Sequence, residues 1–251
     1  MIPNPIHKVL SSIEKHRVRA LLMGGQACVL YGAAEFSRDI DLAIVAGPPN
    51  LSRLRAALAE LRAEVIAVPP FELKYLHKGH AVHFRCSAPD VSGLRIDVMT
   101  KMRGVDDFSK LWRRRLTLRA EDGTSYDLMS LPDLVNAKKT QRDKDWPMIR
   151  RLIEGDFFTH RSQPKLQHLR FWFLELRTPE LLLEIASAHP DLCRKLAKRR
   201  RLLEFAALAT EMALIDALSE EEKAEREADR RYWAPLKAEL EQLRHLRLRT
   251  G

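Results

Sequence analysis

Residues 18–45 constrain the fold more than any other part of the sequence. An apolar run, "VRALLM", ends at Gly24 and Gly25, a segment compatible with a short helix follows, and a second apolar run, "RDIDLAIV", contains Asp39 and Asp41. Side chains of a strand alternate between its two faces, so both carboxylates lie on one face and the apolar residues on the other. The pattern predicts a strand–helix–strand unit with two acids presented on one side of its second strand.

Two carboxylates held this close repel each other unless a cation lies between them. Mg²⁺, which prefers oxygen ligands, removes that repulsion. Asp97 in "LRIDVMT" is a third acid in an apolar strand-like run, and an adjacent strand would place it beside Asp39 and Asp41. The three acids predict a metal site, with two Mg²⁺ ions about 3.5–4 Å apart as the expected arrangement.

The glycine pair suggests what such a site would bind. A strand that ends in two glycines and opens into a helix exposes backbone N–H groups that phosphates can approach closely. Gly24 and Gly25 are therefore candidates for holding a triphosphate next to the metal. This layout favours phosphoryl or nucleotidyl transfer.

Mixed strands and helices are predicted as far as about residue 157. We expect helices at residues 3–16, 26–33, 51–62, 107–114, 131–140 and 145–155, and strands at 18–23, 38–45, 64–68, 80–86, 94–100, 115–120 and 124–130. From about residue 160 only leucine-rich helical patterns occur, so that region is expected to be all-α. Two domains are predicted, at residues 1–157 and 158–251.

Charge and composition narrow the function further. The chain has 251 residues and a net charge of +9, which favours polyanionic partners such as RNA. No apolar run approaches the roughly 20 residues that span a bilayer, and the N-terminus lacks a signal-peptide pattern. Cys28, Cys86 and Cys193 are scattered, as expected of reduced thiols in a cytoplasmic protein.

The segment "GGQACVLYGAAEFSRDIDL" resembles the signature of the nucleotidyltransferase superfamily, whose core is polymerase-beta-like. Its Gly-Gly-x-Ala followed by Asp-Ile-Asp-Leu is similar to the AbiEii and MenT-like toxin group and its uncharacterised bacterial relatives. "LPDLVNAKKTQRDKDW" fits a later motif of the same group. The resemblance covers residues 18–155 and implies an α+β fold, with a mixed sheet flanked by helices, followed by the all-α C-terminal region.

The resemblance also implies roles for the residues already singled out. Gly24 and Gly25 would contact the nucleotide phosphates. Asp39 and Asp41 would bind Mg²⁺, and Asp97 would join this metal and catalytic set and activate the attacking hydroxyl as a general base.

Further nucleotide contacts follow from the same resemblance. Lys138 would contact the triphosphate, and Arg142, four residues later, would share its helix face; a solvated helix surface is the alternative for this pair. Relatives often have Arg and Thr before the first aspartate, where this chain has Glu35 and Ser37. Ser37 offers a hydroxyl to phosphate, and Arg38 is the candidate source of positive charge.

The implied activity is transfer of a nucleoside monophosphate from ATP or another NTP to a hydroxyl acceptor. By resemblance the acceptor would be tRNA, and the protein would be the toxin of a toxin–antitoxin pair with a cognate antitoxin, or a phage-defence component. Three alternatives stay open: a small-molecule (antibiotic) nucleotidyltransferase, a nucleotide-binding regulator without turnover, and a non-catalytic nucleic-acid-binding protein.

The helical region offers its own candidates. In "RKLAKRRR", a helix would place Arg194, Lys198 and Arg201 on one face, as contacts for nucleic-acid phosphates or as a solvated surface. The aromatic residues of segments 171–176 and 230–236 are expected in the core rather than stacked on bases.

Five other polar residues have structural interpretations. His77, His80 and His83 are expected to line a groove or to be exposed, and their strand-like setting disfavours a zinc site. Lys144 and Asp145 are expected to form a structural pair.

Overall fold

The computed structural model describes residues 4–250, with side chains for residues 4–248. The chain divides into two compact units. The first unit comprises the residues up to Ala137 and those from Tyr232 onward, and the second unit is Lys138–Arg231. The predicted boundary after residue 157 falls inside helix α7 (Asp145–His160), so the compact units do not divide the chain at that point.

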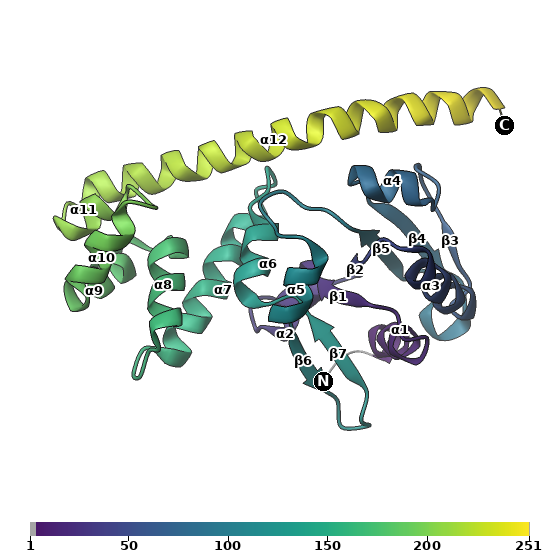
Figure 1. Ribbon diagram of the computed structural model, residues 1–251, viewed down its shortest axis with the longest axis horizontal. Helices are drawn as coiled ribbons and strands as arrows, with labels where there is room; N and C mark the ends of the chain where they lie inside the picture. Colours follow the sequence, from purple (N-terminus) through teal and green to yellow (C-terminus); the bar gives the residue numbers. More distant parts are fainter. Residues whose placement is uncertain (1–3, 251) are drawn as a thin grey trace. The chain divides into compact units, whose positions relative to one another are not determined.

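The first unit is built on a mixed seven-stranded sheet (Figure 1). The strand order is β3-β4-β5-β2-β1-β7-β6. Neighbouring strands are antiparallel except for the pairs β2/β5 and β1/β7, which are parallel. The strands are β1 (Ala20–Met23), β2 (Asp39–Ile44), β3 (Ala63–Val65), β4 (Val82–Cys86), β5 (Arg95–Met99), β6 (Leu116–Arg119) and β7 (Ser125–Leu128).

Helices flank this sheet, as the sequence predicted. They are α1 (Asn4–Lys15), α2 (Gly24–Leu30), α3 (Pro48–Glu60), α4 (Leu73–Lys78), α5 (Phe108–Arg114) and α6 (Leu131–Lys138), with a 3₁₀ turn at Pro89–Val91. In α1 the apolar residues Ile6, Val9, Leu10 and Ile13 recur at helical spacing and are all buried. The short helix α4 was not predicted; the other helices and every strand were, with boundaries that shift by a few residues.

The second unit contains only helices among its described residues. They are α7 (Asp145–His160), α8 (Leu166–Glu175), α9 (Pro179–Ala188), α10 (Pro190–Ala197), α11 (Leu203–Ala207) and the first part of α12 (Glu211–Thr250). Phe171, Trp172 and Phe173 are buried, which confirms the expectation that the first aromatic segment belongs to the core. Together the mixed sheet and the all-α region confirm the predicted α+β fold.

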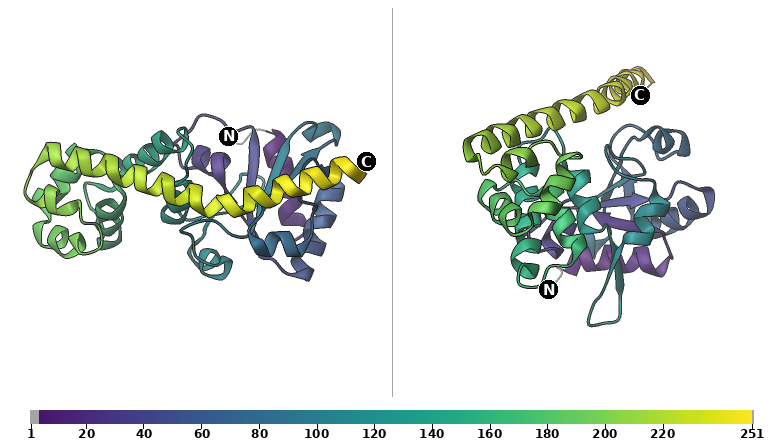
Figure 2. Two further views of the ribbon diagram at one scale, coloured as in Figure 1. Left: turned by 90° about the horizontal axis from the view of Figure 1, so that it is seen from above. Right: turned by 60° about the vertical axis from the view of Figure 1, so that its left-hand side comes forward.

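Helix α12 is continuous over 40 residues, with Pro235 inside it (Figure 2). Its residues up to Arg231 belong to the second unit, and its later residues belong to the first. Tyr232 and Trp233, in the second aromatic segment, are only half-buried. The expectation that this segment lies in the core is therefore wrong. None of the helices in the described part of the chain combines the length and the apolar character needed to cross a membrane.

Candidate active site

The two aspartates of β2 lie on one face of the strand. Asp39 and Asp41 are half-buried, whereas Ile40 and Leu42 are buried. This alternation is the one that the sequence predicted. The core therefore holds the strand through its apolar face and leaves both carboxylates on the other.

The sheet brings the third aspartate next to this pair. In the parallel pairing of β2 with β5, Asp97 lies directly opposite Asp41. On the other side of β2, Met23 at the end of β1 is also in register with Asp41. Asp41 therefore lies between the glycine turn that follows Met23 and the strand that carries Asp97.

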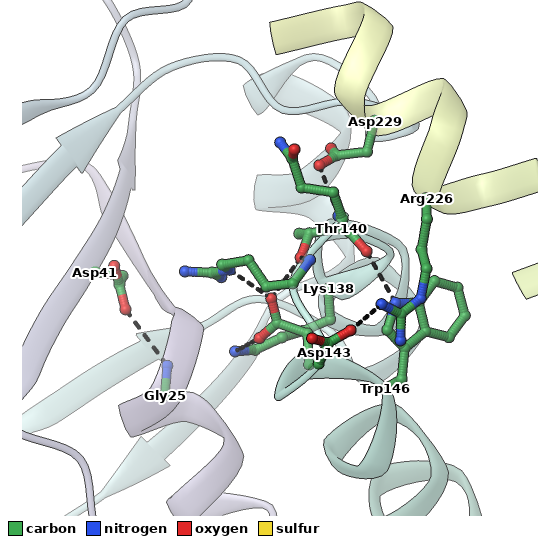
Figure 3. A network of polar contacts seen from close by, with 11 residues as sticks. Gly25, Asp41, Lys138, Thr140, Asp143, Trp146, Arg226 and Asp229 are labelled. Atoms are coloured by element: carbon green, nitrogen blue, oxygen red, sulfur yellow. Dashed lines mark hydrogen bonds and ion pairs between the residues drawn. The ribbon is translucent and has the colours of Figure 1, made fainter. Parts of the chain in front are cut away.

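The glycine turn touches the Asp41 carboxylate. Gly24 has a positive φ of 66°, and a Cβ at this position would be 1.8 Å from Asp41 Oδ2. The backbone N–H of Gly25 donates a hydrogen bond of 3.4 Å to the same oxygen (Figure 3). Only glycine combines this backbone conformation with so close an approach.

The segment before β2 packs on the same turn. A Cβ at Gly25 would lie 2.6 Å from Ser37 Oγ. The Ser37 hydroxyl donates to the backbone carbonyl of Asp39 at 3.1 Å. Arg38 is exposed, with its guanidinium 5.9 Å from the centre of the Phe36 ring. Ser37 is thus held beside the glycine turn, and Arg38 is free of any ion pair among the described side chains.

Asp97 is held by Arg95, which the sequence analysis did not single out, and by His83, for which it predicted no such contact. Arg95 donates from Nε to Asp97 Oδ1 and from Nη2 to Oδ2, both at 2.7 Å. His83 Nδ1 is 2.8 Å from Asp97 Oδ1, and the two residues lie opposite each other in the antiparallel pairing of β4 with β5. The sequence "RID" could have indicated the contact between Arg95 and Asp97, because residues two apart on a strand share a face.

These partners set the charge state of Asp97. Burial raises its pKa, but the hydrogen bonds with His83 and Arg95 outweigh burial, so the pKa of Asp97 is lowered overall. The hydrogen bonds to Asp97, with a smaller contribution from the charges of Asp39 and Asp41, raise the pKa of Arg95. Asp97 is therefore an ionised carboxylate, and a guanidinium supplies positive charge among the three acids.

Lys138 and Arg142 do not share a helix face, which corrects the sequence interpretation. Helix α6 ends at Lys138, and Arg142 lies in the connection to α7. The two side chains meet instead on Asp145, which is 1% exposed: Lys138 Nζ is 3.0 Å from Oδ1 and Arg142 Nε is 2.7 Å from Oδ2. Thr140 also donates to Oδ2, at 2.5 Å.

After the end of α6, the Asp145 carboxylate gathers three donors, from Lys138, Thr140 and Arg142. Burial raises the pKa of Asp145. The charge of Lys138 is the largest of the effects that lower this pKa, and the net shift is downward. Lys138 is itself only 7% exposed. Lys138 and Asp145 thus form a buried ion pair, and the predicted partner of Asp145, Lys144, is not part of it.

The basic segment of the second unit is also corrected. Helix α10 ends at Ala197 with Lys198 as its C-cap, and Arg201 lies in the turn that precedes α11, so the three residues do not all share one helix face. All three are exposed. The neighbouring Arg200 is buried and bonds to Glu221 and to the carbonyl of Phe173, so it has a structural role.

The histidines agree with expectation only in part. His77 is exposed, as expected. His80 is 1% exposed and its Nε2 is 2.9 Å from Glu239, instead of lining a groove or being exposed. His83 contacts Asp97, as described above. Within residues 4–248, no group of three or more His, Cys, Asp and Glu side chains is arranged as a metal site.

The donor chemistry at β2 and β5 nevertheless suits Mg²⁺. Asp39 and Asp41 offer carboxylate oxygens on a single face, and Asp97 lies in register beside them. The turn at Gly24 places a backbone without side chains against the Asp41 carboxylate. No protein-family model matches the sequence, and no curated protein matches it significantly.

Proposed function

We propose that this protein is a Mg²⁺-dependent nucleotidyltransferase that transfers a nucleoside monophosphate from an NTP to a hydroxyl group. The observation that carries the proposal is the arrangement around Asp41. Its carboxylate lies against the side-chain-free turn of Gly24 and Gly25, with Asp97 in register on the next strand. The proposal also rests on the resemblance of this segment to the nucleotidyltransferase superfamily.

In this proposal Asp39 and Asp41 hold Mg²⁺, with Asp97 completing the set. The bound metal would neutralise negative charge on the triphosphate and on the attacking oxygen. Gly24 and Gly25 leave the backbone open to a close approach by phosphate. Catalysis would consist mainly of positioning and charge neutralisation, with pyrophosphate as the leaving group.

The contacts of Asp97 favour one of its two expected roles. A general base works best with a pKa near the operating pH, whereas hydrogen bonding lowers the pKa of Asp97. Arg95 and His83 also fix its orientation. We therefore assign Asp97 to metal binding and positioning rather than to proton abstraction.

The proposed acceptor is RNA, and tRNA in particular. The net charge of +9 favours a polyanionic acceptor over a cationic drug. The resemblance to the AbiEii and MenT-like group further suggests a toxin that is neutralised by a cognate antitoxin. Lys138 and Arg142 remain proposed triphosphate contacts, although their ion pairs with Asp145 give them a structural function as well.

The test is incubation of the protein with Mg²⁺, total tRNA and each α-³²P-labelled NTP in turn. We expect label on RNA with the wild type, and a loss of at least about a hundredfold with Asp39→Asn/Asp41→Asn, in line with the loss of charge stabilisation. Asp90→Asn/Asp216→Asn removes two exposed acids elsewhere and serves as the control. Labelling that persists in the Asp39/Asp41 variant, or that is absent for every NTP and acceptor, contradicts the proposal.

A further inference from the structure

A cleft in the second unit combines an excess of positive charge with an unsatisfied buried arginine. It encloses about 600 Å³. Four cationic residues and two acids line it, together with apolar and small residues of α9 and α12. The charged lining residues are Arg150, Arg177, Lys223, Arg226, Asp143 and Glu222.

The two acids of the cleft are both taken by one cation. Arg226 bonds to Asp143 (Figure 3) and, through Nη2, to Glu222 at 2.7 Å. Lys223 forms an ion pair with Glu220, which does not line the cleft. Arg150 is exposed and has no ion pair among residues 4–248. The cleft therefore keeps a positive potential after its internal pairs are formed.

Arg177 is the least satisfied of these cations. It is 6% exposed, and its Nε has no hydrogen-bond acceptor among the described residues. Its Nη1 is 3.3 Å from Glu221 Oε2, but Arg200 already holds both oxygens of that carboxylate, at 3.0 and 2.7 Å. Arg177 therefore shares Glu221 with Arg200. The charges of Glu175 and Glu225 also attract it, but its Nε has no acceptor within the described part of the chain. A buried N–H donor without an acceptor is costly unless a ligand supplies the acceptor.

Trp146 orients the cationic groups. Its indole N–H donates to the carbonyl of Thr140 at 2.8 Å, which fixes the ring. The guanidinium carbons of Arg177 and Arg226 lie 4.6 and 5.4 Å from the centre of the ring. Cation–π contacts of this kind hold the two planar donors in place without consuming their N–H groups.

From these contacts we infer that the cleft binds a phosphate group of a ligand, with Arg177 as its buried anchor and Arg150 and Lys223 at its rim. Planar guanidinium groups match phosphate oxygens through paired, charge-assisted hydrogen bonds. Phosphate is favoured over a carboxylate because four cationic and two acidic side chains line the cleft. All residues that line the cleft belong to the second unit, and the inference does not depend on the proposed transfer activity.

The test uses the full chain carrying Asp39→Asn/Asp41→Asn, in EDTA, so that phosphate binding through a metal at the candidate active site is absent. Calorimetry measures binding of inorganic tripolyphosphate, and fluorescence anisotropy measures binding of a labelled single-stranded RNA. We expect Arg150→Gln/Lys223→Gln to weaken binding of at least one probe about tenfold or more. Arg151→Gln/Arg170→Gln removes two exposed positive charges outside the cleft and should weaken it less than about threefold.

A second variant tests the anchor. Arg177→Lys keeps the positive charge but removes the planar fork, and should also weaken binding while the rim pair is intact. If Arg177→Lys does not fold, the result for Arg150→Gln/Lys223→Gln still tests the proposal. If Arg150→Gln/Lys223→Gln weakens the binding of tripolyphosphate alone, the ligand of the cleft is a small phosphorylated molecule. If it weakens the binding of RNA alone, the ligand is a nucleic-acid backbone. Absence of binding of both probes, or equal weakening by the cleft and control variants, overturns the proposal. Failure of the transfer assay leaves this result unaffected.

Discussion

At the scale of single residues, the candidate active site depends on the absence of one side chain. Gly24 is needed twice over, because its φ is positive and because a Cβ would overlap the Asp41 carboxylate. The sequence indicated that glycines were needed here, but not that an aspartate from the next strand fills the space. That contact exists only after β1 and β2 have paired in register.

We predict that Gly24→Ala is more damaging than Gly32→Ala. Both positions have positive φ, where a non-glycine residue costs about 1–2 kcal/mol, but a Cβ at Gly32 would meet nothing within 4 Å. The additional cost at Gly24 comes from displacing Asp41. Urea denaturation should give the larger loss of unfolding free energy for Gly24→Ala, and nucleotide transfer should fall only in that variant. Equal losses in the two variants would refute the packing argument.

At the scale of elements, the connection between α6 and α7 is organised by one buried carboxylate. Asp145 collects Lys138, Thr140 and Arg142, and the backbone N–H of Gln141 donates to Asp229 of α12 at 2.9 Å within the same unit. The sequence analysis placed Lys138 and Arg142 on one helix face and paired Asp145 with Lys144. In the structure both Lys138 and Arg142 bind Asp145 instead.

We predict that Asp145→Ala costs about 3–5 kcal/mol of unfolding free energy, because it leaves Lys138 buried and uncompensated. Arg142→Ala should cost less than about 1 kcal/mol, since 56% of the Arg142 side chain is exposed. Chemical denaturation of the two variants, with the exposed Lys144→Ala as control, measures both effects. A loss at Asp145 no greater than that at Arg142 would contradict the assignment of a buried ion pair.

At the scale of the whole molecule, the last part of α12 contacts α4 and the residue that follows the C-cap of α4, all within the first unit. Glu239, near the end of α12, accepts hydrogen bonds from Lys78 Nζ at 2.5 Å and is 2.9 Å from Nε2 of the buried His80. The hydrogen bond from Lys78, followed by that of His80, lowers the pKa of Glu239. No local pattern near residue 80 pointed to a partner so far along the chain.

This pair predicts a pH-dependent contribution to stability. Because the pKa of Glu239 is lower in the folded than in the unfolded chain, its contribution is present above about pH 4.5 and is lost as the pH falls through the folded value. Glu239→Gln should therefore unfold at a lower temperature than the wild type at pH 7, with the difference shrinking below about pH 4.5. Glu241→Gln, an exposed change on the same helix, should behave as wild type. A difference that grows on acidification would contradict the prediction.

The sequence alone determined the order of strands and helices, the change to an all-α region and the face on which Asp39 and Asp41 lie. These features depend on local periodicity and on glycine, which act over a few residues. The sequence also predicted Asp97 on an adjacent strand, but only the tertiary structure gave its register opposite Asp41. Only the tertiary structure put Arg95 and His83 on Asp97 and drew Lys138 and Arg142 to Asp145. Strand register and ion pairing between distant residues depend on how the whole core packs, and periodicity carries no information about that.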